Sequence, residues 1–171
     1  MDQVEVDLPN DWEPRDHQKP LWRAMTGGSL RGVAVWHRRA GKDSTALNAT
    51  ALLMHQRIGT YWHMLPEKEQ ARKAVWNGID RAGRRIIDQV FPASIRSNTV
   101  DDEMRINLRC GSIWQLVGSD NYNSLVGANP VGVVFSEYSV GNPAAWDYIR
   151  PILAENGGWA MFLYTPRGRN H

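Results

Sequence analysis

The chain has 171 residues, of which 42% are hydrophobic, and its 20 basic and 18 acidic side chains leave a net charge of +2. This length suits one domain with a buried core, and the near-neutral charge excludes a strongly basic nucleic-acid protein of the kind that composition alone reveals. The single cysteine, Cys110, excludes an internal disulfide, and the five histidines lack metal-ligand spacing. No signal peptide or membrane span is recognisable, which predicts a protein of a reducing cytoplasm.

The elements predicted from the sequence alternate between helices and strands after a polar lead of about residues 1–14. In chain order they are a helix over 17–25, a strand over 33–36, a helix over 42–56, a strand over 61–65, a helix over 66–90, strands over 99–108 and 112–117 with a hairpin around 109–111, and strands over 131–135 and 159–164. This alternation predicts an α/β layered fold with a largely parallel sheet. In such sheets, ligands bind at the carboxyl ends of the strands.

The segment from Gly32 to Ser44 indicates a buried strand that ends in a glycine-lysine turn before a helix. Amides at a helix N-terminus are unpaired and the helix dipole favours anions there, so Gly41 and Lys42 predict a loop that holds the phosphates of a nucleoside triphosphate. The match to the pattern G-x-x-x-x-G-K-[ST] is incomplete. Trp36 replaces its first glycine and Asp43 its hydroxyl residue.

A second part of the candidate site follows the strand predicted over 131–135. Ser136 and Glu137 place a hydroxyl and a carboxylate where the first strand would deliver its loop. Phosphoryl transfer to water needs a carboxylate that orients and polarises the attacking water, and Glu137 is the candidate for that role. The alternative is that Glu137 only begins a solvent-exposed loop.

Three segments together resemble a known protein family. They are Trp36–Asp43 (WHRRAGKD), Val133–Glu137 (VVFSE) and Tyr164–His171 (YTPRGRNH). In order and spacing they look like the Walker A, Walker B and coupling motifs of the large terminase subunits of tailed phages. The stretch 65–76 and the tripeptide Leu125-Val126-Gly127 are also similar to that family, and the resemblance extends from about Pro14 over nearly the whole chain.

The resemblance implies a P-loop NTPase fold of the RecA/ASCE type, with three layers and a largely parallel sheet flanked by helices, formed by residues 1–171 as one ATPase domain. It implies hydrolysis of ATP with Mg²⁺ to drive double-stranded viral DNA through the portal protein into a procapsid. The expected partners include the small terminase subunit and further copies of this chain, which would form a ring when assembled, with a monomer as the alternative for the isolated chain. The expected location is the host cytoplasm, without a membrane. The family's nuclease domain, and with it DNA cleavage, is not expected in this chain.

The resemblance also implies roles for individual residues. ATP binding falls to Gln18, His37, Arg38, Arg39, Ala40, Gly41, Lys42, Asp43 and Ser44, catalysis to Glu137, Arg38 and Lys42, and coupling to Thr165, Pro166 and Gly168. Gln18 would read adenine through its amide. Arg38 would reach the γ-phosphate, whereas Arg39 is expected to face solvent or a carboxylate of the sheet. Val126 departs from the family, because many members carry there an arginine proposed to act on the neighbouring subunit.

Two further departures concern the metal and are complementary. Asp43 supplies an acid where Walker A has a hydroxyl, and Ser136 supplies a hydroxyl where Walker B has an aspartate. Since Mg²⁺ requires hard oxygen ligands but not a particular strand to carry them, both residues are expected to lie near one magnesium ion, delivered by adjacent parallel strands. The alternative is a disabled nucleotide site.

Several readings remain open from the sequence alone. Arg81, Arg84 and Arg85 would share one face of the helix predicted over 66–90, either as a solvated face or as contacts to phosphates of DNA or to a neighbouring subunit. The acidic run 101–103 is expected to be a polar hairpin segment rather than a metal cluster. The functional alternatives are another P-loop DNA translocase or helicase-like ATPase, and a nucleotide- or DNA-binding module that has lost catalysis.

Overall fold

A single sheet forms the centre of the computed structural model, which describes residues 7–167. Its seven strands are β1 (Arg31–Val35), β2 (Thr60–Leu65), β3 (Arg96–Val100), β4 (Arg105–Leu108), β5 (Ile113–Gly118), β6 (Pro130–Phe135) and β7 (Trp159–Tyr164), in the order β1-β7-β6-β2-β5-β4-β3. The pairings that join β1, β7, β6, β2 and β5 are all parallel. The pairings of β4 with β5 and with β3 are antiparallel, so that β4 alone of the seven described strands runs against the others. The predicted α/β fold with a largely parallel sheet is confirmed.

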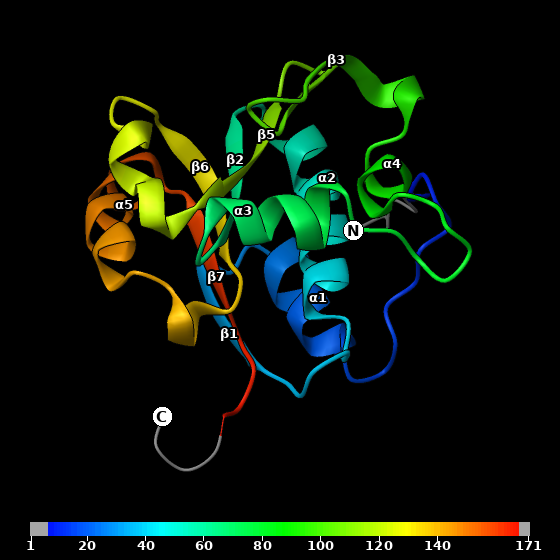
Figure 1. The fold of residues 1–171 in the computed structure, drawn as a ribbon, viewed down its shortest axis with the longest axis horizontal. Helices are drawn as coiled ribbons and strands as arrows, with labels where there is room; N and C mark the ends of the chain where they lie inside the picture. Colours follow the sequence, from blue (N-terminus) through cyan, green and yellow to red (C-terminus); the bar gives the residue numbers. More distant parts are fainter. Residues whose placement is uncertain (1–6, 168–171) are drawn as a thin grey trace.

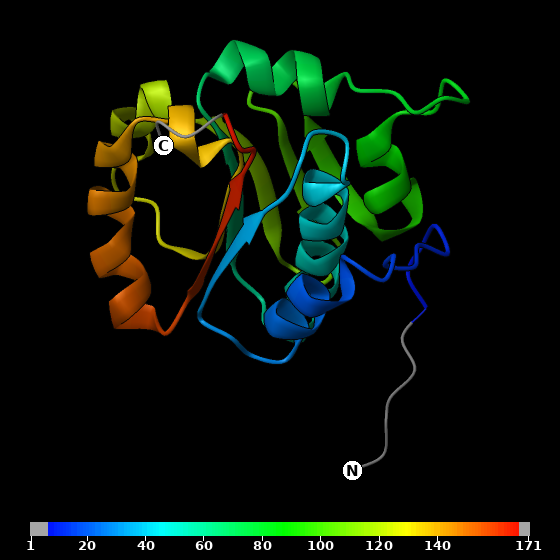
Figure 2. The same cartoon turned by 90° about the horizontal axis from the view of Figure 1, so that it is seen from below.

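Helices cover both faces of this sheet and complete the expected three layers. They are α1 (Lys19–Thr26), α2 (Lys42–Gln56), α3 (Lys68–Ala71), the π-helix η1 (Arg72–Trp76), α4 (Ile86–Val90), the short 3₁₀ segments η2 (Ala93–Ile95), η3 (Ser119–Leu125) and η4 (Tyr138–Val140), and α5 (Pro143–Asn156). Helices α1 and α2 lie on one face and α5 on the other (Figures 1 and 2). None of the described helices is both long and apolar enough to cross a membrane.

Aromatic side chains fill the core on both faces of the sheet. On the α2 face, Trp114 packs against Phe91 and stacks on Trp76, with ring centroids 5.1 and 6.5 Å away respectively. On the α5 face, Phe135 of β6 stacks on Phe162 of β7 at 5.0 Å. Large aromatic surfaces on both faces bury the central strands, whose continuous apolar sequences are typical of parallel sheets.

The prediction of one continuous helix over residues 66–90 is wrong in its middle. The helical run stops at Trp76, and Asn77 and Gly78 lead into a turn that is stabilised by Asp80, whose Oδ1 accepts hydrogen bonds from the amides of Ala82 (2.8 Å) and Arg84 (3.0 Å). The three arginines expected on one helical face therefore do not share a helix. Arg84 instead pairs with Asp80 at 2.9 Å, and Arg85 donates to the carbonyl of Trp76 at 2.7 Å.

Two other predictions of elements need correction. The strand predicted over 99–108 is two strands, because the chain reverses at residues 101–104 and β3 pairs with β4 as a hairpin. The acidic run 101–103 lies in this turn, as expected.

Helix α5 was not among the predicted elements, although Asn142 caps it by accepting a hydrogen bond from the amide of Ala144 at 3.0 Å. The hairpin predicted around 109–111 is confirmed between β4 and β5.

Candidate functional site

The loop between β1 and α2 (residues 36–41) has the tight geometry that the sequence predicts for a phosphate-holding turn. Its two left-handed residues are Arg39, with φ of 61°, and Gly41, with φ of 78°. Gly41 is the N-cap of α2, and a Cβ atom there would collide with the side-chain amide of Gln18. Glycine is therefore required at this position both for its backbone conformation and for space. The chain then turns so that the first amides of α2 face the loop.

Lys42 lies across the mouth of this loop. Its Nζ atom donates to the carbonyl of Trp36 at 3.2 Å and to that of His37 at 3.1 Å. The side chain is only 6% exposed, so most of it is buried while the ammonium group stays at the N-terminus of α2. The positive charge and the positive end of the helix dipole thus coincide, which favours an anion at this point.

Gln18 and His17, which immediately precede α1, support the loop from behind. The amide of Gln18 donates from Nε2 to the carbonyl of Ala40 at 3.0 Å and accepts at Oε1 from the amide of Arg15 at 2.9 Å. His17 donates to the same Ala40 carbonyl at 2.9 Å. The structure therefore places Gln18 at the loop, with both ends of its amide bonded to backbone. Adenine recognition by Gln18 stays a prediction.

Glu137 follows β6 in a left-handed conformation, with φ of 50°, which is uncommon for a residue other than glycine. Residues held in such conformations cluster at active sites and ligand clamps, although Asp11 and Met104, away from this site, adopt the same conformation. The hydroxyl of Thr165, just after β7, donates to Glu137 Oε1 at 3.1 Å. Arg167 lies 3.9 Å from the other carboxylate oxygen, Oε2. Of the predicted coupling residues, Thr165 therefore touches Glu137, Pro166 is its neighbour in the chain, and Gly168 lies outside the described residues.

Asp43, on the first turn of α2, binds a residue that the sequence analysis did not select. Its Oδ1 atom accepts a hydrogen bond from Nε2 of His63, on β2, at 2.8 Å. Partial burial opposes ionisation of Asp43, but the His63 hydrogen bond, the nearby Ser136 hydroxyl and the Lys42 charge outweigh it and hold the pKa of the carboxyl below its usual value. Asp43 is therefore a carboxylate at neutral pH.

Ser136 and Asp43 come together as expected, but not by way of adjacent strands. Strand β7 lies between β1 and β6, and Asp43 reaches toward Ser136 from the helix rather than from a strand. Ser136 Oγ is buried and makes no hydrogen bond of normal length with the described residues, although it is near enough to Asp43 to affect its pKa. The expectation of adjacent strands is wrong, since the crossover through α5 inserts β7 between them.

An open pocket of about 300 Å³ unites the two parts of the site. Its lining residues are Arg38, Arg39, Gly41, Lys42, Asp43, Ser44, Glu137 and Arg167. Four of these side chains are cationic and two are carboxylates, so the pocket suits an anion with a cation beside it. His37 does not line the pocket, and its imidazole bonds to the carbonyl of Arg38 at 2.7 Å.

The oxygen atoms at this pocket fit a magnesium ion bound together with phosphates. Two oxygen donors line the pocket: the Asp43 carboxylate, whose side chain is 40% exposed, and Glu137 Oε2, which is buried without a hydrogen-bond partner among the described residues. Ser136 Oγ does not line the pocket, but it is buried behind Asp43 and also lacks a hydrogen-bond partner among the described residues. No group of three or more His, Cys, Asp or Glu side chains in residues 7–167 is arranged to hold a metal unaided. Magnesium is usually held by one or two protein oxygens, phosphates and water, which is the kind of donor set present here.

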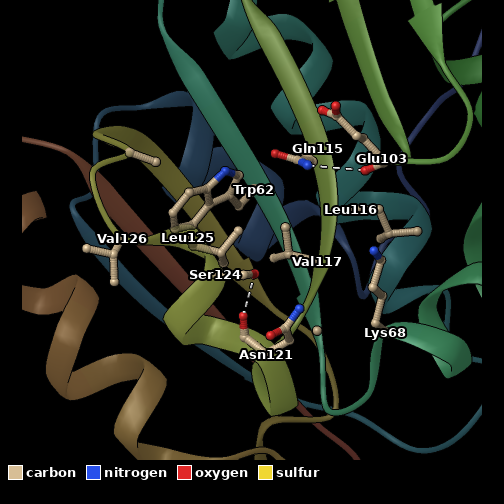
Figure 3. A pocket seen from close by; sticks show the side chains of 12 residues that line it. Trp62, Lys68, Glu103, Gln115, Leu116, Val117, Asn121, Ser124, Leu125 and Val126 are labelled. Atoms are coloured by element: carbon tan, nitrogen blue, oxygen red, sulfur yellow. Dashed lines mark hydrogen bonds between the residues drawn. The ribbon is translucent and has the colours of Figure 1, made fainter.

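A larger pocket, of about 420 Å³, lies on the α5 face of the sheet between β5 and η3 (Figure 3). Trp62, Val117 and Leu125 form its apolar wall, and Lys68 lies at its rim. Val126, at the position where the family often has an arginine, lines this pocket and is 66% exposed. None of the predicted site residues within 7–167 contributes to it.

Sequence reasoning missed three residues of the site: His17, His63 and Arg167. His17 and Arg167 adjoin predicted residues, so their place in the sequence gave a usable signal. His63 gave none, because it is twenty residues from Asp43 and meets it only when β2 takes its place in the sheet.

Comparison with known proteins gives matches only at the level of structure. No family model matches the sequence, and no curated protein matches it either. The ATPase domain of the large terminase of Thermus phage P74-26 matches with a TM-score of 0.74 and 20% identity, over 94% of this chain and 68% of that chain. The large terminase from a thermophilic bacteriophage matches with a TM-score of 0.70 and 10% identity, over 88% of this chain and 39% of that chain.

A complex of the second terminase with ATP-γ-S also matches, with a TM-score of 0.65 and 9% identity over 87% of this chain and 37% of that chain. The chain thus spans about two thirds of the Thermus phage domain and well under half of the other terminase. At these identities the likeness concerns the arrangement of strands and helices. In that arrangement, the chain has the three-layer α/β fold of the ATPase domains of phage large terminases.

Proposed function

We propose that this chain is the ATP-hydrolysing motor domain of a phage large terminase, which uses Mg²⁺ and ATP to move double-stranded DNA into a procapsid. The observation that carries the proposal is a single pocket that is lined both by Lys42, the first residue of α2, and by Glu137, which follows β6. The shared fold supports it, since the matched Thermus phage protein is an ATPase domain and the other terminase was solved with ATP-γ-S.

The residues of the pocket divide the work of hydrolysis. Lys42 and the first amides of α2 bind the β- and γ-phosphates, and Arg38 stabilises the charge that spreads over the transferred phosphoryl group. Glu137 orients and polarises the attacking water. Asp43 and Ser136 would hold magnesium, which would neutralise charge on the phosphates.

The hydrogen bond between Thr165 and Glu137 links hydrolysis to the segment that leaves β7. When the γ-phosphate departs, the contacts of Glu137 change, and Thr165 passes this change to the chain that follows. In the proposed motor, that movement acts on DNA, in a ring of subunits docked on the portal protein with the small terminase subunit.

Steady-state hydrolysis and ATP-γ-S binding by purified variants test the proposal. Lys42→Ala is expected to abolish both, because no other lysine of residues 7–167 lines this pocket. Glu137→Gln is expected to bind ATP-γ-S like the wild type but to lower kcat on the order of 100-fold or more, since its amide keeps the shape but cannot act as a base. Lys68→Ala is the matched control, because Lys68 lines the other pocket.

The outcomes separate the proposed function from its rivals. Binding of ATP-γ-S without hydrolysis in the wild type, alone and with DNA, would support a nucleotide-binding module that has lost catalysis. Hydrolysis in Lys42→Ala at the wild-type rate would remove this pocket from the reaction. A translocase that works outside phage packaging would hydrolyse ATP with DNA but would not bind a portal protein.

A further inference from the structure

His63 is a fully buried histidine whose one polar side-chain contact with the described residues is directed to the candidate site. It lies in the middle of β2, opposite Val134 of β6 and Leu116 of β5, and its side chain is 0% exposed. The ring packs near Trp114, with centroids 6.4 Å apart. Its Nε2 atom bonds to Asp43 Oδ1 at 2.8 Å, across the end of β6.

The other nitrogen of this ring, Nδ1, is buried and makes no hydrogen bond with any of the described residues. Because the Asp43 carboxylate can only accept, the hydrogen bond assigns a proton to Nε2. A buried polar atom without a partner is unfavourable, and an apolar side chain would pack in this cluster without that cost. The contact with Asp43 is therefore the feature that distinguishes His63 from an ordinary core residue.

This contact determines where the Asp43 carboxylate points. A carboxylate on the first turn of a helix commonly turns back onto the free amides of that helix. Here Oδ1 is held by His63 from the neighbouring layer, so the carboxylate stays at the pocket beside Ser136. A carboxylate has two oxygen atoms, and Oδ2 is left for a cation.

We propose that His63 is a positioning residue, which holds the Asp43 carboxylate in the orientation that binds the magnesium of a magnesium–nucleotide complex. This inference rests on the proposed function. It means that β2, through His63, orients the Asp43 carboxylate, which the segments that follow β1 and β6 do not do by themselves. Partners of metal-binding side chains typically change metal affinity by roughly 10- to 100-fold when they are removed.

Isothermal titration calorimetry of ATP-γ-S over a series of Mg²⁺ concentrations, and in EDTA, tests this role without measuring turnover. His63→Met keeps the size of the side chain but has no donor, whereas His63→Gln places an amide N–H near the position of Nε2. We expect His63→Met to raise the Mg²⁺ concentration for half-maximal binding by roughly 10-fold. His63→Gln is expected to recover most of that loss, and binding in EDTA is expected to stay within about 2-fold of wild type in both variants, because neither touches the phosphate contacts.

A double-mutant cycle with Asp43→Ala shows whether His63 acts through Asp43. In the Asp43→Ala background, His63→Met is expected to cause no further change in Mg²⁺ dependence, since the group that it positions is gone. The same shift in both backgrounds would overturn the proposal. So would equal effects of the Met and Gln variants, or a loss of thermal stability in His63→Met with unchanged Mg²⁺ dependence, which describes a packing role.

A replacement variant and two outcomes for the wild type complete the test. If His63→Met does not fold, His63→Asn replaces it, because its shorter side chain places the amide near Nδ1, out of reach of Asp43. If the wild type binds no ATP-γ-S at any Mg²⁺ concentration, the proposed function fails and this inference fails with it. If the wild type binds ATP-γ-S with a Mg²⁺ dependence that His63→Met leaves unchanged, only the inference fails.

Discussion

At the scale of single residues, the question is which of Arg38 and Arg39 contacts the γ-phosphoryl group. Both line the pocket, and neither forms an ion pair with a described residue. Arg39 has a left-handed backbone, with φ of 61°, which is the conformation that lets the loop turn toward Gly41. Arg38 precedes this turn. The two side chains therefore leave the loop from different backbone conformations.

We expect Arg38→Ala to lower kcat for ATP far more than it weakens ADP binding, because its guanidinium would contact the γ-phosphoryl group that ADP lacks. Arg39→Ala is expected to have the milder effect on kcat and serves as the matched control. The measurements are kcat by phosphate release and the Kd of ADP by calorimetry. Equal losses for ADP and ATP would indicate simple charge attraction, and a larger defect in Arg39→Ala would exchange the two assignments.

The sequence predicted which residues form the site better than it predicted the contacts between them. Gly41, Lys42, Asp43 and Glu137 were predicted to meet, and they line one pocket. The partner of Asp43 was not predictable, because His63 resembles any other polar residue in an apolar strand until the order of the strands is known. The local sequence contains the signals for turns and helix starts, whereas contacts between the helical layer and the sheet depend on the order of the strands.

At the scale of elements, the break in the helix predicted over 66–90 has a local cause. The dipeptide Asn77-Gly78 is a turn signal that outweighs the apolar spacing around it, and Asp80 then satisfies two backbone amides that a helix would have satisfied. The indole N–H of Trp76 donates to Asp101 at 2.7 Å, which attaches the end of the helical run to the β3–β4 turn. That second contact spans 25 residues and is not encoded locally.

Helix α5 offers a test of an element that supports β6 and β7. Asn142→Ala removes the side-chain oxygen that accepts from the amide of Ala144, and we expect it to lower the free energy of unfolding by about 1 kcal/mol. Urea-induced unfolding measures this change. Asn98→Ala, at an exposed position of β3, is the control and is expected to stay within about 0.5 kcal/mol of wild type. Equal stability of the two variants would show that the cap contributes nothing.

At the scale of the whole molecule, the sheet is joined to the α2 face through Trp114, which is fully buried between Trp76 and Phe91. We expect Trp114→Ala to lower the free energy of unfolding by roughly 3–5 kcal/mol, because the cavity cannot close around two rigid rings. Trp114→Phe, which keeps one ring, is expected to cost less than half as much. Chemical denaturation of both variants checks this order, and similar losses would mean that the site relaxes freely.

The architecture as a whole was predictable because alternating strands and helices allow few arrangements. Apolar runs such as 131–135 and 159–164 marked the central strands correctly. Their order in the sheet was not predictable from those runs, since any of them would pack equally well beside β1. The crossover that inserts β7 between β1 and β6 is a property of the complete fold.

Strand β7 acts as a spacer of fixed width. It is hydrogen-bonded to β1 on one side and to β6 on the other. Because neighbouring strands are about 4.8 Å apart, the ends of β1 and β6, which lead to Lys42 and to Glu137, lie about 10 Å from each other. Backbone geometry, rather than any side chain, therefore sets the opening into which a ligand must fit. Because the strands fix this separation, we expect an exchange of side chain beside the opening, such as an acid for a hydroxyl at Asp43 on the first turn of α2, to leave its width unchanged. The side chains at the site can therefore differ while the distance between the two strand ends stays the same.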